Sequence, residues 1–120
     1  MRVLHVIPSV SLSSGGPGKA IVQMEQALLA RGVEVVTIST NDNGNGNLLP
    51  VELETPVSLS GVTRIYFPMQ LHAYKVSWPM RRWLQREIKN FDVVHVHAVF
   101  SFAPVMAALI ARKNKIPYVI

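Results

Sequence analysis

The sequence contains no cysteine, which excludes disulfides, paired-cysteine redox chemistry and thiolate metal sites, although it leaves the cellular compartment open. It also lacks a hydrophobic run typical of a membrane span, because the longest one, residues 98–111, is interrupted by Ser101 and Pro104. Residues 1–8 are too short and too strand-like for a signal peptide. We therefore expect a cytoplasmic protein.

Acidic residues are scarce, with 7 Asp and Glu against 12 Lys and Arg, and the net charge of +5 favours anionic partners in general. Part of the positive charge lies in residues 78–89, where helical spacing separates an apolar side from a basic one. The apolar side holds Met80, Trp83, Leu84 and Ile88, and the polar side holds Arg81, Arg82, Gln85 and Lys89. We interpret this segment as a core-packed helix with a solvated basic face. The alternative is peripheral contact with the inner face of a membrane.

Nucleic acid is not an expected partner, because the basic residues do not interleave with exposed aromatic residues on a recognisable binding module. A zinc site is not expected either. His95 and His97 have no nearby carboxylate or thiol in the sequence and fall short of the usual ligand set.

The 120 residues suffice for about one domain. Apolar strands are predicted over residues 3–7, 33–38, 62–67 and 92–97, and amphipathic helices over 17–31, 78–90 and 101–115. A flexible loop is expected over residues 41–47, and irregular structure over 48–60. The alternation of strands and helices predicts an α/β, Rossmann-like fold: a parallel sheet with its first strand central and helices on both faces.

The first helix is predicted to present one apolar stripe to the sheet. Ile21, Met24 and Leu28 form that stripe, while Glu25 is expected on its flank with the neighbouring glutamines. Gly32 is expected to end the helix.

A glycine-rich turn lies between the first strand and this helix, with glycines at positions 15, 16 and 18. Such glycines let a ligand approach the main chain, and the free N–H groups of the helix that follows favour negative charge. The turn therefore predicts a phosphate-binding site. A turn that only reverses the chain is the alternative.

Two familiar phosphate motifs do not fit the turn. A P-loop requires glycine at position 13 and Ser or Thr at position 20, where Ser13 and Ala20 stand. The third glycine of the dinucleotide fingerprint would fall on Ile21, and the second strand has no acidic residue at its end. We therefore expect neither magnesium-dependent ATP binding nor NAD binding, and no cofactor.

For the common strand order 3-2-1-4-5, ligands bind where the winding reverses, between the first and fourth strands. The glycine turn should meet there the segment that begins at His97 and continues through Phe100 and Ser101. Strand periodicity puts His95 on the same face as His97 but deeper. We interpret His95 as a core histidine, and His97 as either a site residue or a structural one.

The glycine turn, the helix ending Leu-Leu-Ala-Arg-Gly-Val-Glu-Val (residues 28–35) and the segment Phe-Asp-Val-Val-His-Val-His (residues 91–97) carry a resemblance across the whole chain. The sequence resembles the amino-terminal, acceptor-side domain of retaining family-four glycosyltransferases, which pair two Rossmann-like domains in a GT-B architecture. The resemblance implies transfer of a sugar, expected to be a hexosyl group, from a nucleoside diphosphate sugar to a saccharide or lipid-linked acceptor.

The same resemblance implies roles for residues of this chain. Gly15, Gly16 and Gly18 would face the donor diphosphate, and His97 would face the acceptor and the reacting sugar as the catalytic residue. Phe100 and Ser101 would complete the substrate-binding segment.

The chain ends inside an apolar strand, residues 116–120. We therefore expect residues 1–120 to be one truncated domain without the carboxy-terminal donor-binding domain, inactive alone and prone to self-association. The alternative function is a non-catalytic, Rossmann-like module that uses the same turn to hold a phosphate-bearing ligand or a partner subunit.

Overall fold

The computed structural model describes residues 1–7, 16–41, 51–68, 77–96 and 102–119. Its strands are β1 (Arg2–Val6), β2 (Glu34–Thr40), β3 (Val57–Leu59), β4 (Val62–Phe67), β5 (Val93–Val96) and β6 (Tyr118–Val119). Its helices are α1 (Gly16–Ala30), α2 (Trp78–Glu87), the short 3-10 helix η3 (Ile88–Asn90) and α3 (Phe102–Lys113). The helices and strands alternate as the hydrophobic pattern predicts.

The strands form one sheet in the order β3-β4-β2-β1-β5-β6. Every neighbouring pair is parallel except β3 and β4, which are antiparallel. With β3 set aside, this is the expected order 3-2-1-4-5 with β1 in the centre. The α/β Rossmann-like fold class is therefore confirmed.

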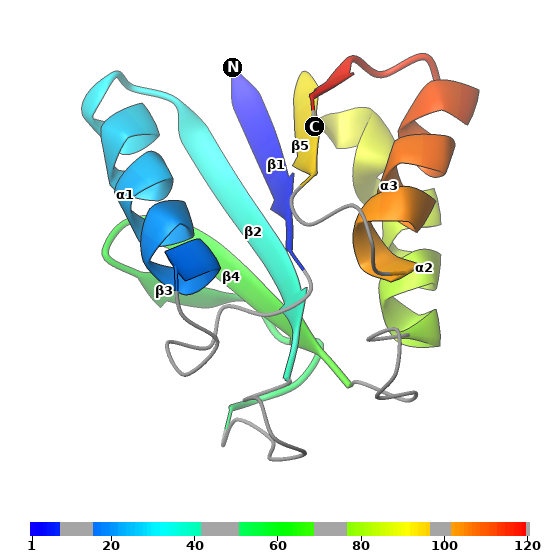
Figure 1. The fold of residues 1–120 in the computed structure, drawn as a ribbon, viewed down its shortest axis with the longest axis horizontal. Helices are drawn as coiled ribbons and strands as arrows, with labels where there is room; N and C mark the ends of the chain where they lie inside the picture. Colours follow the sequence, from blue (N-terminus) through cyan, green and yellow to red (C-terminus); the bar gives the residue numbers. More distant parts are fainter. Residues whose placement is uncertain (8–15, 42–50, 69–76, 97–101, 120) are drawn as a thin grey trace.

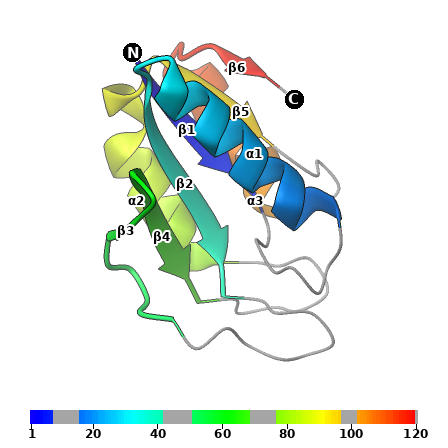
Figure 2. The same cartoon turned by 90° about the vertical axis from the view of Figure 1, so that its left-hand side faces the viewer.

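Helices cover both faces of the sheet, with α1 on one side and α2 and α3 on the other (Figure 1). Seen from the side, α1 crosses in front of the strands, while β3 and β4 lie at one edge (Figure 2). The strand β3 corrects the expectation of irregular structure over residues 48–60. This short strand pairs with β4 across a tight turn, where Gly61 takes a φ of 86°, so pairing within a local hairpin orders the residues that follow Pro56.

The main core lies between the sheet and the pair α2 and α3. Alternate strand residues supply its sheet side, because successive side chains of a strand point to opposite faces. The cluster contains Leu4, Val6, Val36, Ile38, Ile65, Phe67, Val94 and Val96 from the strands, and Met80, Leu84, Ile88, Phe91, Met106, Ala107, Ile110 and Ala111 from the other side. Burial of this apolar surface is the principal stabilising term of the domain.

Helix α2 has the two faces that its sequence predicts. Met80 and Leu84 of α2 and Ile88 of the adjoining η3 are fully buried, whereas the basic side chains at positions 81, 82 and 86 of α2 and 89 of η3 are exposed. Ser77 caps the helix, and its hydroxyl accepts a hydrogen bond from the backbone N–H of Met80 at 3.4 Å. The interpretation as a core-packed helix with a solvated basic face is confirmed.

Helix α1 meets the sheet differently from the prediction. Ile21 is buried as expected, but Met24 is 39% exposed and Glu25 is only 2% exposed. The predicted stripe through Met24 is therefore wrong, because the sheet face beneath this helix carries polar side chains that bind Glu25. Gly32 ends the helix as expected: its φ is 78°, and the N–H groups of Gly32 and Val33 donate to the carbonyls of Leu29 and Leu28.

Candidate functional site

The winding of the sheet reverses at β1, which pairs with β2 on one side and with β5 on the other. Val6 at the end of β1 lies beside Val96 at the end of β5. The two chain segments that follow these strands thus leave the sheet at the same edge. In open parallel sheets this carboxyl edge, at the point of reversal, is where ligands bind.

The glycine turn leads into α1 at this edge. Gly16 and Gly18 belong to the first turn of the helix, and the amino ends of both α1 and α3 lie at the carboxyl edge of the sheet (Figure 1). A helix amino end offers free backbone N–H groups and a partial positive charge to an anion. The described geometry therefore fits the phosphate-binding role expected of this turn.

Four of the expected site residues, Gly15, His97, Phe100 and Ser101, lie outside the described residues. His97 follows Val96, the last residue of β5, directly in the sequence. The position and the roles of these four residues stay predictions.

Polar side chains also lie at the same edge, at the end of β2. Ser39, Thr40 and Asn41 are buried, the Ser39 hydroxyl donates to the Thr40 carbonyl at 3.1 Å, and the Asn41 N–H donates to the Phe67 carbonyl at 2.9 Å. Asn41 is the first residue of the loop expected over residues 41–47. A run of three polar residues directly after the apolar part of β2 is the signal that could have marked this part of the edge.

On the face of the sheet that α1 covers, a row of polar side chains crosses four neighbouring strands before they reach the carboxyl edge. Arg64, Thr37, His5 and His95 occupy adjacent register positions on β4, β2, β1 and β5. Burial lowers the pKa of His95 below its usual 6.5, which keeps the imidazole neutral at physiological pH. This supports the interpretation of His95 as a structural histidine.

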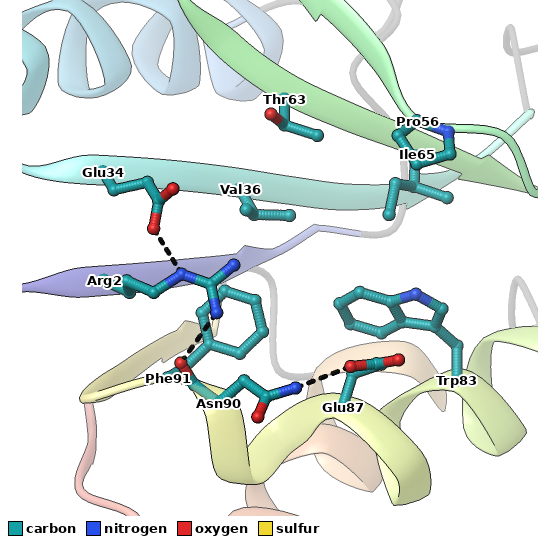
Figure 3. A pocket seen from close by; sticks show the side chains of 10 residues that line it. All are labelled: Arg2, Glu34, Val36, Pro56, Thr63, Ile65, Trp83, Glu87, Asn90 and Phe91. Carbon is teal, nitrogen blue, oxygen red and sulfur yellow. Dashed lines mark hydrogen bonds and ion pairs between the residues drawn. The ribbon is translucent and has the colours of Figure 1, made fainter.

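A pocket lies at the opposite, amino edge of the sheet, on the α2 side (Figure 3). It is an open pocket of about 220 Å³. Its walls are Arg2, Glu34, Val36, Pro56, Thr63, Ile65, Trp83, Glu87, Asn90 and Phe91. Because it lies at the amino ends of the strands, this pocket is separate from the candidate site.

The charged groups of this pocket bind one another. Arg2 forms an ion pair with Glu34 and donates to the Asn90 carbonyl at 3.0 Å, and its guanidinium lies 4.8 Å from the centre of the Phe91 ring. The Asn90 amide donates to Glu87 at 2.7 Å. These contacts join the start of β1 to the end of η3, so we assign the pocket a structural role.

The part of the chain that the structure describes contains neither a membrane-spanning helix nor a cluster of metal ligands. Within it, no helix combines the length and apolarity needed to cross a bilayer. Nor do three or more His, Asp or Glu side chains converge there as a metal site would require.

Comparison with known proteins decides the family. The sequence model of Glycosyltransferase Family 4 matches residues 14–120, which include the glycine turn and every strand after β1. The chain belongs to glycosyltransferase family 4. No curated protein sequence matches it.

The fold of this family-4 chain is similar to the crystal structure of a UGT transferase from Siraitia grosvenorii in complex with UDP. The TM-score is 0.55, and 15% of the aligned residues are identical. The match covers 98% of the present chain but only 27% of that protein. At this identity the likeness bears on the fold alone, which is a Rossmann-like domain of the kind found in GT-B glycosyltransferases.

Proposed function

We propose that this family-4 chain is the acceptor-side domain of a two-domain glycosyltransferase. The full enzyme would transfer a hexosyl group from a nucleoside diphosphate sugar to a saccharide or lipid-linked acceptor, with retention of anomeric configuration. The observation that carries the proposal is the position of the amino end of α1, at the carboxyl edge beside the β1–β5 reversal. Family membership supports the same conclusion.

The glycines supply the chemistry expected of a donor site. A diphosphate needs backbone N–H donors at close range, and Gly15, Gly16 and Gly18 have no side chain to block its approach. The structurally similar UGT transferase was crystallised with UDP, which supports a nucleoside diphosphate as the ligand class. No bound cofactor is required in this proposal, since the nucleotide sugar is a co-substrate.

The segment after β5 supplies the acceptor side. In the proposal, His97 faces the acceptor and the reacting sugar, and Phe100 and Ser101 contact the substrate beside it. An imidazole at this place can accept or donate a proton near neutral pH.

A donor-binding domain would have to face this edge. Sugar transfer develops charge on the sugar ring and on the departing diphosphate, and both need preorganised groups from two sides of a cleft. We therefore propose that residues 1–120 are inactive alone.

The basic face of α2 is the feature of the structure that favours an acceptor located at a membrane. Arg81, Arg82, Arg86 and Lys89 are exposed on it, and Trp78 beside them is 46% exposed. Since the apolar stripe of this helix is buried in the core, its contact with anionic lipid would be electrostatic and sensitive to salt. The compartment we propose is the cytoplasm, with such contact at the inner face of the membrane.

The test is a screen of the full-length protein against UDP-, GDP- and ADP-sugars with candidate acceptors, with mass detection of the transferred sugar. We expect transfer from one donor class, and an NMR spectrum of the product should show the anomeric configuration of the donor. Nucleotide binding without transfer to any acceptor would favour the alternative, a non-catalytic phosphate-binding module. Absence of both binding and transfer would contradict the proposed function.

A further inference from the structure

Helix α1 carries a buried acid on the face that it packs against the sheet. Glu25 is 2% exposed, and a carboxylate is rarely buried to this degree unless it is paired. Its hydrogen-bond partners come from two strands and lie 12 and 39 residues further along the chain. Glu25 is therefore a specific point of attachment between α1 and the sheet.

Arg64 of β4 binds both oxygens of this carboxylate. Its Nη2 donates to Oε1 at 2.5 Å and its Nε donates to Oε2 at 3.2 Å. The two side chains are 12% and 2% exposed. This two-pronged arrangement is geometrically specific, because two parallel N–H···O bonds hold the planar guanidinium and the carboxylate in a fixed relative orientation.

Thr37 of β2 adds a third contact, since its hydroxyl donates to Oε2 of Glu25 at 2.5 Å. Thr37 and Arg64 are register partners on adjacent strands. Burial would lower the pKa of Arg64, but its hydrogen bonds and charge attraction with Glu25 and Tyr66 raise it instead. The carboxylate is thus held by donors from two strands at once.

Apolar packing under α1 is limited by comparison. On this face, the buried apolar residues within the described part are the cluster Ile7, Ile21 and Tyr66 with Val51 packed against it, and the valines at positions 3, 35 and 62 near the amino ends of their strands. Apolar contacts are non-directional and leave a helix freer to rotate or slide. Hydrogen bonds from Arg64 and Thr37 fix both the rotation of α1 and its position along the strands.

We propose that Glu25 is a positioning residue that, through Arg64 and Thr37, sets where the amino end of α1 lies at the carboxyl edge. Gly16 precedes Glu25 on the same continuous helix, which rises about 1.5 Å per residue. A displacement at Glu25 is therefore carried to the glycine turn. The inference rests on the proposed function, because it concerns the turn that is assigned to the donor diphosphate.

The experiment uses the full-length protein, with UDP and GDP as binding probes in calorimetry and hydrogen exchange as the measure of helix attachment. We expect Glu25→Gln and Arg64→Gln each to weaken binding of the preferred nucleotide by roughly 2- to 30-fold, because mutations that act on a site through intervening contacts have effects of this size. Exchange of the α1 amides should rise while that of α2 stays unchanged. Gln23→Ala, an exposed change on the same helix, should leave both measurements as in the wild type.

A paired variant separates positioning from mere stability. Glu25→Met combined with Arg64→Met removes both charges and fills the space with apolar groups, a replacement that often preserves or raises stability. We expect a stable protein whose affinity for the nucleotide remains reduced. Wild-type affinity in this stable double variant, or in Glu25→Gln, would overturn the role of Glu25.

The outcomes for this role and for the proposed function are distinct. A wild-type protein that binds neither UDP nor GDP would contradict the proposed function, and the assignment of Glu25 to its site would fail with it. Suppose instead that the wild type binds UDP or GDP and that Glu25→Gln has the same affinity and the same exchange of the α1 amides. That result would overturn the role of Glu25 and leave the proposed function standing.

Discussion

The imidazole rings of His5 and His95 lie against each other across β1 and β5, with their centroids 5.2 Å apart and their planes inclined at 46°. The two residues are register partners at the centre of the sheet. His5 is buried and His95 is half-buried. This contact belongs to the interior of the domain, one layer below the edge at which His97 begins the next segment.

Protonation of His95 should destabilise the fold. Burial lowers the pKa of His95 in the folded state below its usual 6.5, so the unfolded chain binds a proton more readily. The contribution of this histidine is fully present above about pH 6.5 and is lost as the pH falls through the folded-state value. We expect an NMR titration of His95 to give a midpoint below 6.5, and His95→Gln to reduce the loss of unfolding free energy on acidification. A midpoint at or above 6.5 would contradict this account.

Truncating the buried face of α2 should cost far more stability than truncating its basic face. Leu84 is fully buried in the main core, whereas Arg82 is exposed on the same helix. We expect Leu84→Ala to lower the unfolding free energy by about 2–5 kcal/mol and Arg82→Ala to change it by less than about 0.5 kcal/mol. Denaturant titration of the two variants compares them directly, and equal losses would show that the basic face is not merely solvated.

Two glycines with positive φ should tolerate alanine to different degrees. Gly32 and Gly61 have φ values of 78° and 86°, a conformation that costs other residues about 1–2 kcal/mol. A Cβ at Gly32 meets open space, whereas one at Gly61 would lie 3.3 Å from a methyl group of Leu29. We expect Gly61→Ala to lower the melting temperature more than Gly32→Ala does. Equal losses of melting temperature would mean that the Leu29 side chain moves aside without cost, and a larger loss in Gly32→Ala would contradict this prediction.

In the proposed two-domain glycosyltransferase, changes on the two sides of the candidate site should have separable effects. Gly16→Val would place a branched side chain where a diphosphate approaches the backbone, so we expect a higher KM for the donor with the fold preserved. His97→Ala should lower kcat by about 100-fold or more, the usual contribution of a positioned acid or base. Steady-state kinetics and melting curves test both. Unchanged turnover in His97→Ala, together with a melting temperature as low as that of His95→Ala, would make His97 a structural residue.

Much of the fold follows from local pattern. The Val- and Ile-rich segments at residues 3–7, 33–38, 62–67 and 92–97 alternate with helical segments, and such alternation has few solutions other than a parallel sheet with helices on both faces. The place of the candidate site follows too, because strand order alone fixes the point of reversal. Four of its six expected residues lie outside the described part of the chain.

By itself, the sequence determined the alternation of strands and helices, the buried stripe of α2 and the resemblance to family 4, because each depends on periodicity or motif within a continuous segment. Only the tertiary structure decided that Glu25, not Met24, faces the sheet and that β3 pairs with β4. The face that a helix buries depends on the surface that receives it. For α1 that surface includes Arg64, 39 residues further along the chain from Glu25, and no local pattern in the helix encodes a partner at that distance.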